Sequence, residues 1–503
     1  MINDHEKTKT LPDHNNYKDT KIATNIEDII LDCRTIMNNT MELNVMDINI
    51  KGAQCAVVTI EGMVSTSSMA DLVFRPLMEL NVSKNISPSE AVYNFVTEKS
   101  LLAAERHIDY TYGDVLLDLF SGFAVIFIDG IPKGVSFGIQ GYAQRAISEP
   151  TSEHNLMGSQ EAFVEVIRTN ISLVRRRMKS PSLRFEMMHI GEHSSTDVCI
   201  VYMTDKAPAE IVNDIRKKLS HIKLDTIISS GYIKPFLEDK NDCNIFSNMG
   251  TTERPDVLCT KVNEGKVCVL IDGTPFAIVC PMLFSENFKT IDDYCSKKYF
   301  ATYIRWIRYF AFFLASAFPG LYVAAASYHP EMLNMKLLIN LSASEQTTLY
   351  PLFFEILIIM ALLELMREAS IRMPSAISSA VSIVGGLIIG DAAVKSGIIS
   401  APLLIIVGLT ATASFIIPNL NQQTSFIRLA FIFSGGAAGF FGIAICAVII
   451  AANVCSMDDY SIPYTAPISP FNFKGIKDVF SRASFRSMEK AHTTISDYSK
   501  EKK

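Results

Sequence analysis

The chain has 503 residues and a formal net charge of −6, which leaves room for several domains and argues against nucleic acid as the main partner. Its ten cysteines are scattered without a C-x-x-C pair, a pattern that excludes the common zinc and redox motifs and is typical of a reducing compartment. The sequence contains no P-loop, no G-x-G-x-x-G after a strand, no G-x-S-x-G and no H-E-x-x-H. We therefore expect neither an enzyme nor a bound cofactor or metal.

The first 300 residues or so have the pattern of a soluble protein. Residues 1–24 are polar and lack the apolar segment of a signal peptide, so we predict a disordered tail and a domain that stays in the cytoplasm. From about residue 25, short apolar strands alternate with amphipathic helices, as in the strand expected at 53–63 and the helix at 67–80. This alternation predicts a two-lobed α/β domain with subdomains at 25–150 and 151–303.

One hairpin pattern occurs twice in this soluble part. The stretch 123–137 contains the turn Asp129-Gly130, and the stretch 265–280 contains Asp272-Gly273. In both stretches a glycine precedes the first strand, and a proline follows the turn after one residue. The repetition is consistent with two independent hairpins that need the same turn chemistry, or with two related α/β subdomains.

A predicted amphipathic helix at 159–178 lies between the two hairpins. Ser159 is a candidate cap at its start, and Glu161 suits the positive end of the helix dipole. Its last turn carries Arg175, Arg176 and Arg177, where cations suit the negative end. The three arginines either form a solvated cluster that matches the dipole, or contact an anionic ligand or the carboxylates of a partner protein.

The back part of the chain has the pattern of a helical membrane protein. About 20 apolar residues are needed to cross a hydrocarbon core of roughly 30 Å. We predict a helical membrane domain over 304–456 with about four to six membrane segments, followed by a basic cytoplasmic tail over 457–503. Pro319 and Gly320 predict a kink in the first apolar run. The runs occupy 309–327, 349–366, 376–390, 398–417 and 427–455.

Two carboxylates lie in the second apolar run. Glu364 is near the end of the run and within reach of Arg367, whereas Glu355 has no cation three or four residues away. An ionised group at the centre of a bilayer costs on the order of 3 kcal/mol. Since Glu355 is less deep, its penalty is smaller, but we still expect it to face protein or water. It is then part of a polar pathway for ions or of a structural hydrogen bond between helices.

Small residues and a polar break distinguish the run at 376–390, which is short for a span. It ends at Asp391 and Lys395, so this run and the next form either two helices or a re-entrant hairpin. The spacings Gly386-x-x-x-Gly390 and Gly435-x-x-x-Gly439 let helix backbones approach closely, within one chain or between copies. The candidate pore or gating residues are Glu355, Glu364, Gly386, Gly390, Asp391 and Lys395.

The distribution of lysine and arginine predicts the orientation in the membrane. Lys297, Lys298, Arg305 and Arg308 precede the first run, which places the N-terminal domain inside. The basic tail is then expected inside as well. Five full spans would put the tail outside, so we expect that one run is re-entrant or that the last run is bent.

Several long motifs resemble the A subunit of the GerA-type spore germinant receptors, over roughly residues 25–470. In the membrane part they are E-x-x-R-E-A-S-I-R-M-P (364–374), V-S-I-V-G-G-L-I-I-G-D-A-A-V-K-S-G-I-I-S-A-P (381–402) and A-S-F-I-I-P-N (413–419). In the soluble part they are I-S-E-P (147–150), F-V-E-V-I-R-T-N-I-S-L-V-R-R-R-M-K-S-P-S-L-R (163–184), R-P-D (254–256), L-I-D-G-T-P (270–275) and D-D-Y (292–294).

The resemblance implies a multi-pass protein of the bacterial spore inner membrane, with its N-terminal domain on the spore core side. It implies a B subunit that binds the nutrient, a C-subunit lipoprotein, further copies of this chain and membrane lipid as partners. It also implies that an oligomer of this subunit forms a ligand-gated path for ion release during germination. The alternative is a scaffold or signal-relay subunit that has no permeation path of its own.

Overall fold

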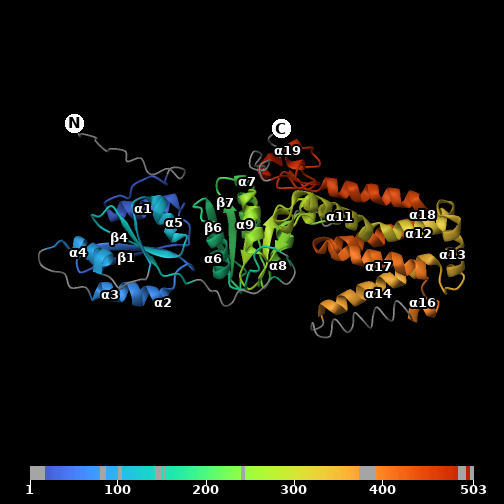
Figure 1. Ribbon diagram of the computed structural model, residues 1–503, viewed down its shortest axis with the longest axis horizontal. Helices are drawn as coiled ribbons and strands as arrows, with labels where there is room; N and C mark the ends of the chain where they lie inside the picture. The colour runs from blue at the N-terminus through green and yellow to red at the C-terminus, as the bar shows by residue number, and fades with distance from the viewer. Residues whose placement is uncertain are drawn as a thin grey trace. The chain divides into compact units, whose positions relative to one another are not determined.

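The structure, a computed structural model, describes residues 17–79, 86–99, 105–141, 150, 153, 155, 157–238, 244–372, 392–484 and 494–498 (Figure 1). The chain divides into two compact units. The first comprises Met1–Lys240, Met249–Met282 and Thr493–Lys503, and the second comprises Asn241–Asn248 and Leu283–His492.

The first unit contains two five-stranded sheets, and all of their strand pairs are antiparallel. The strand orders are β1-β2-β4-β5-β3 and β6-β7-β9-β10-β8, so the second sheet repeats the connectivity of the first. Of the two explanations for the repeated hairpin, this shared strand order favours related subdomains, which stay a prediction. The strands are β1 (Leu43–Ile50), β2 (Ala53–Ile60), β3 (Arg106–Asp109), β4 (Phe123–Ile128), β5 (Gly134–Gly138), β6 (Leu183–Ile190), β7 (Thr196–Met203), β8 (Gly250–Thr252), β9 (Val267–Ile271) and β10 (Ala277–Cys280).

Helices cover both faces of the first sheet. Val58 and Val125 belong to the core beneath α1 and α5, whereas their chain neighbours Val57 and Ile126 belong to the core beneath η1 and α4. This division follows from the alternation of side chains along a strand. The helical segments of the first lobe are α1 (Ile26–Ile36), α2 (Thr66–Met69), η1 (Ala70–Phe74), α3 (Arg75–Met78), α4 (Pro88–Asn94), η2 (Phe95–Lys99) and α5 (Tyr112–Leu119).

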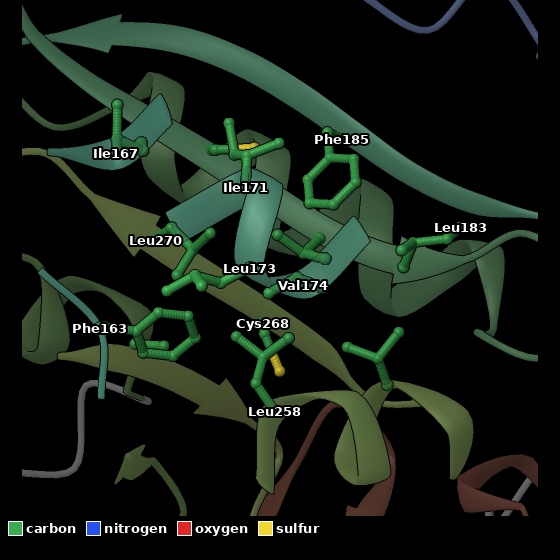
Figure 2. Packing of buried hydrophobic residues seen from close by; sticks show 14 of the residues in the cluster. Phe163, Ile167, Ile171, Leu173, Val174, Leu183, Phe185, Leu258, Cys268 and Leu270 are labelled. Atoms are coloured by element: carbon green, nitrogen blue, oxygen red, sulfur yellow. The ribbon is translucent and has the colours of Figure 1, made fainter. Parts of the chain in front are cut away.

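The second lobe is built in the same way, and Figure 2 shows one of its cores. The apolar face of α6 packs on β6 and β9 and against α9, with Ile171 and Val174 of α6 close to Phe185. Cys199 and Cys268 are buried in the strands of this core as free thiols. The helices are α6 (Ile167–Arg177), α7 (Ala209–Ser220), α8 (Ser230–Leu237) and α9 (Pro255–Asn263), with η7 (Ile495–Tyr498) also in this unit.

The repeated Ile-Asp-Gly turns cap the first helix of each lobe. Asp129 Oδ1 accepts the Ile26 N–H at 3.2 Å, and Asp272 Oδ1 accepts the Ile167 N–H at 3.0 Å. The start of a helix leaves backbone N–H groups without partners. In both lobes the aspartate of the Ile-Asp-Gly turn accepts a hydrogen bond from one of these N–H groups. The helix predicted from Ser159 therefore begins later, at Ile167, because the cap comes from the following hairpin and not from Ser159.

A buried carboxyl group of the first lobe gives a prediction for pH. Asp109 accepts the hydroxyl hydrogen of Ser136 at 2.5 Å, and burial raises the pKa of Asp109 from 3.8 to about 7 although this hydrogen bond opposes the shift. The folded lobe thus holds a proton that the unfolded chain has lost, so its stability should fall as pH rises from about 4 to 7. We expect hydrogen-exchange protection of β3 and β5, corrected for intrinsic exchange, to fall in this window. In the Asp109→Asn variant the pH slope should be flatter, and an unchanged slope would contradict the assignment to Asp109.

The second unit is helical apart from a two-stranded sheet, within the residues that the structure describes. The predicted kink is confirmed, because α11 and α12 are bent by 51° at a break just before Pro319. The elements are η3 (Phe284–Phe288), α10 (Asp292–Cys295), α11 (Lys298–Ser316), α12 (Phe318–Tyr328), η4 (Pro330–Met332), α13 (Met335–Glu345), α14 (Leu352–Arg372), α16 (Ala393–Lys395), α17 (Ala401–Phe415), η6 (Pro418–Leu420), α18 (Asn421–Ser456), β11 (Asp458–Asp459), β12 (Ile462–Pro463) and α19 (Phe473–Ile476).

In the described part of the chain, one segment has the length and composition of a membrane-crossing helix, and a second does if a bent pair of helices is taken as one span. One is Pro418–Ser456, with a mean hydropathy of 2.3 and only 17% of its most apolar window buried, and the other is the bent pair α11 and α12. The α17 helix is apolar but shorter, and α14 carries several charges. The expected number of about four to six membrane segments therefore stays a prediction.

The long helix α18 is broken in its middle and folds back on itself. Ala438 and Gly439 have non-helical backbone angles, and a Cβ on Gly442 would lie 2.1 Å from the carbonyl oxygen of Ser434. Residues eight apart in a continuous helix are separated by about 12 Å, so the chain must reverse here. The first arm is 421–437, and in Figure 1 the second arm, 440–456, runs back toward α19. The prediction of a bent last run is confirmed.

Candidate functional site

Glu355 is a fully buried carboxylate in the first turn of α14. Its Oε2 accepts the backbone N–H of Ser400 at 3.1 Å. Ser400 is the N-cap residue of α17, so the carboxylate lies at the positive end of that helix. Glu355 thus faces protein, as expected. It also makes a hydrogen bond between helices, which is one of the two roles that the sequence analysis considered for it.

The other oxygen of this carboxylate is not satisfied by the described residues. Glu355 Oε1, Ser400 Oγ and Tyr322 Oη are all buried without a hydrogen-bond partner in that part of the chain. Tyr322 lies on α12, close enough to Glu355 for an electrostatic interaction, and packs on an apolar cluster to which α14 also contributes. Leaving a buried polar group unpaired costs about 1–3 kcal/mol, and more for a charge. Buried polar atoms of this kind are where ordered water molecules commonly bind in proteins.

Glu364 lies in a different environment, one with more solvent and a partner cation. It forms an ion pair with Arg367 and accepts the hydroxyl hydrogen of Ser425 at 2.7 Å, and 35% of its side chain is exposed. The pairing with Arg367 is the one that the sequence suggested. The two carboxylates are therefore not brought together, because nine residues place them on opposite faces of α14.

The remaining pore candidates are placed only in part. Lys395 ends the short helix α16 and is exposed. Gly386, Gly390 and Asp391 lie outside the described residues. No cluster of three or more histidine, cysteine, aspartate or glutamate side chains in the described ranges could hold a metal ion.

The second pair of spaced glycines does permit a close helix contact. A Cβ on Gly435 would lie 2.6 Å from the carbonyl oxygen of Gly320, and a Cβ on Gly320 would lie 2.5 Å from that of Phe431. The α12 helix and the first arm of α18 are therefore in backbone contact. For Gly435 this confirms the alternative of tight packing within one chain.

Arg428 is a buried cation that the sequence analysis missed. It lies in the first arm of α18 with 4% of its surface exposed, and it donates to Ser414 Oγ at 3.2 Å and toward the Met360 sulfur at 3.7 Å. Its Nε has no partner among the described residues. The sequence shows Arg428 only as a single arginine at the start of a long apolar run. That pattern is typical of an arginine that anchors a helix at the membrane interface, so it did not indicate a buried cation.

An acid–base network joins the start of α11 to the C-terminal segment. Arg305 contacts Asp293 at 3.1 Å and Asp478 at 3.3 Å, and Arg308 contacts Asp293 at 2.8 Å. These two arginines, used above to predict orientation, are thus neutralised by carboxylates. Since Asp478 follows α18, the start of α11 and the segment after α18 lie on the same side of the helical unit.

Arg175 joins the two lobes of the first unit. Its guanidinium is fully buried between the rings of Phe120 and Phe185, with ring-centre distances of 4.9 and 5.0 Å. It donates to both carboxylate oxygens of Glu42 in the first lobe and to the carbonyl groups of Ser180 and Leu183. Both predictions for Arg175, a solvated cluster and a partner contact, are therefore wrong for this residue.

Arg176 and Arg177 are partly exposed and share one acidic partner. Both donate to the carboxylate of Glu161, and Arg177 also donates to Ser159 Oγ at 2.5 Å. Partial burial tends to raise the pKa of Glu161, but the hydrogen bonds from the two arginines outweigh burial and lower this pKa below 4.5. A contact between these two arginines and a partner protein stays a prediction.

Comparison with known proteins gives a consistent result over most of the chain. The family of Bacillus/Clostridium GerA spore germination proteins matches residues 25–494. Spore germination protein KA of Bacillus subtilis is 34% identical over 443 residues, which are 88% of this chain and 80% of that protein. Spore germination protein GerLA of Bacillus cereus is 29% identical over 466 residues, or 92% of this chain and 94% of that protein.

Among solved structures, the N-terminal domain of the A subunit of the Bacillus megaterium spore germinant receptor GerK3 matches 53% of this chain and 98% of that domain. The identity is 28% and the TM-score 0.40. The family match extends through both the α/β unit and the helical unit described above. This chain therefore belongs to the GerA family of spore germination proteins.

Proposed function

We propose that this chain is the A subunit of a nutrient germinant receptor in the spore inner membrane, where an oligomer of it forms a ligand-gated path for ion release. The nutrient binds a B subunit, and a C-subunit lipoprotein completes the receptor. Binding on the B subunit biases a closed–open equilibrium in the helical unit of this chain. Relatives named as spore germination proteins support the receptor role.

The environment of Glu355 is the observation that carries the ion path. The α18 helix has an apolar and largely exposed surface, whereas Glu355 is buried between helices and one of its oxygens has no partner among the residues that the structure describes. An ionisable group in this position is expensive in a membrane, and such groups usually lie along ion or proton pathways. The hydroxyl groups of Tyr322 and Ser400 extend the polar region beyond the carboxylate.

The path of the chain agrees with the proposed orientation. The start of α11 and the segment around Asp478 lie on one side, and the reversal in α18 lets the chain return to that side. Both are then on the spore core side, where Lys297 and Lys298 also favour placement.

Replacing Glu355 with glutamine tests the ion path. We expect Glu355→Gln to slow nutrient-triggered release of monovalent cations from liposomes that contain all three subunits by about tenfold or more, equivalent to ~1.4 kcal/mol on the barrier. Glu364→Gln is the matched control, since its carboxylate is ion-paired and partly exposed, and it should change release much less. Release at the wild-type rate from a correctly assembled Glu355→Gln receptor would contradict the proposal.

A scaffold or signal-relay role is the second candidate, and the lobe junction favours it. The buried pair of Arg175 and Glu42 holds the two lobes as one body, which is suited to transmit a change between partners. Crosslinking in native membranes separates the two candidates. Oligomers linked through α12, α14 or α18 support the ion path, and a helical unit that remains monomeric supports the relay.

A further inference from the structure

One face of α11 is a continuous stripe of exposed aromatic side chains. They recur at alternating steps of four and three residues, so they lie along a single side of the helix. The exposed fractions range from 46% to 87% of each side chain. The stripe consists of Tyr299, Tyr303, Trp306, Phe310 and Phe313, with Phe300 beside it.

The opposite face of α11 is fixed within the helical unit. Arg305 is fully buried in its contacts with Asp293 and Asp478, and Phe312 packs edge-on against Phe288 with ring centres 5.7 Å apart. The orientation of the helix about its axis is therefore set, and the aromatic stripe points away from this core. Large apolar surfaces that stay exposed on a folded unit mark interaction sites.

The chemistry of the stripe changes along the helix. Tyr299, Tyr303 and Trp306 come first and carry a polar O–H or N–H at the tip of an apolar ring, whereas Phe310 and Phe313 carry none. Tyrosine and tryptophan concentrate where headgroups meet hydrocarbon, because one end of each ring is apolar and the other is wet. The rise from Tyr303 to Phe310 is about 10 Å, comparable to one headgroup layer of roughly 5–8 Å.

We propose that this stripe is a lipid-binding surface that docks in the headgroup layer of the bilayer, with Trp306 at the boundary to the hydrocarbon. Lys297 and Lys298 at the helix start then lie beside anionic phosphate groups. A second copy of the chain fits this face less well, since helix contacts within membranes favour small residues. The inference deepens the proposed function and rests on its membrane location.

The single tryptophan of the chain makes the proposal directly measurable. The full chain is placed in nanodiscs whose lipids carry bromine either near the glycerol end or near the tip of the acyl chains. We expect bromine near the glycerol end to quench Trp306 roughly twice as strongly as bromine at the chain tip, with little quenching by aqueous acrylamide.

Each other outcome overturns the proposal. Stronger quenching from the chain tip places Trp306 in the hydrocarbon, and dominant quenching by acrylamide places it in water. Absence of quenching by either reagent shows that protein covers the stripe, as a second copy would. Failure of the protein to float with lipid vesicles would instead contradict the membrane location in the proposed function.

Moving the tryptophan along the helix gives an internal scale. With Trp306→Phe as background, Tyr299→Trp should become more accessible to acrylamide, and Phe313→Trp should respond more to bromine at the chain tip. Phe312→Trp is the control on the opposite face, and neither lipid bromine nor acrylamide should quench it strongly. A signal that is the same at 299, 306 and 313 would contradict a helix that enters the bilayer through this stripe.

Discussion

Replacing Arg175 with alanine is expected to lower the free energy of unfolding of the first unit by about 3–5 kcal/mol. The substitution leaves the Glu42 carboxylate, 3% exposed, without the guanidinium that neutralises it, and it opens a gap between two aromatic rings. It also removes the donors to the Ser180 and Leu183 carbonyl groups. Urea denaturation of the full chain, followed by hydrogen exchange in β1 and β6, measures this loss on both sides of the junction.

Two further variants separate the buried pair from the general effect of losing an arginine. Arg177→Ala removes a neighbouring cation of the same helix that is partly exposed, so it should cost about 1 kcal/mol or less. The double variant Glu42→Leu with Arg175→Met removes both charges and should recover much of the lost stability. Equal costs for Arg175→Ala and Arg177→Ala would show that the junction depends on other contacts.

Replacing Gly442 with alanine is expected to disrupt the reversal of α18, at a cost of about 3 kcal/mol or more. The added methyl group would lie 2.1 Å from the backbone oxygen of Ser434, and backbone cannot move aside as a flexible side chain does. We expect faster hydrogen exchange across 421–456 and loss of nutrient-triggered ion release, because both arms must shift.

Gly408→Ala in α17 is the matched control for this substitution. Gly408 is also a helical glycine, but a Cβ there meets no atom within 4 Å. Alanine is the better helix former by up to about 1 kcal/mol, so this variant should be as stable as the original chain or slightly more stable. If Gly442→Ala behaved like Gly408→Ala, the close approach of the two arms would be wrong.

Local pattern was enough to predict much of the architecture. Alternation of apolar residues indicated the strands of both lobes, and the two Ile-Asp-Gly turns indicated that a hairpin of the same kind occurs in each. The kink near Pro319 and the pairing of Glu364 with Arg367 also followed from residues close in sequence. Each of these features depends on residues within a few positions of one another, and the local backbone geometry already determines which of their side chains can be in contact.

Composition and periodicity were sufficient to indicate the α/β and helical parts, the apolar runs and the isolated carboxylate of Glu355. Contacts between distant segments were needed to establish that Asp272, rather than Ser159, caps α6 and that Arg175 pairs with Glu42, 133 positions away. The same holds for the hydrogen bond between Glu355 and Ser400 and for the place, at Gly439, where α18 turns back. A buried polar group forms its hydrogen bond with the partner that packing places beside it, and packing depends on the whole fold.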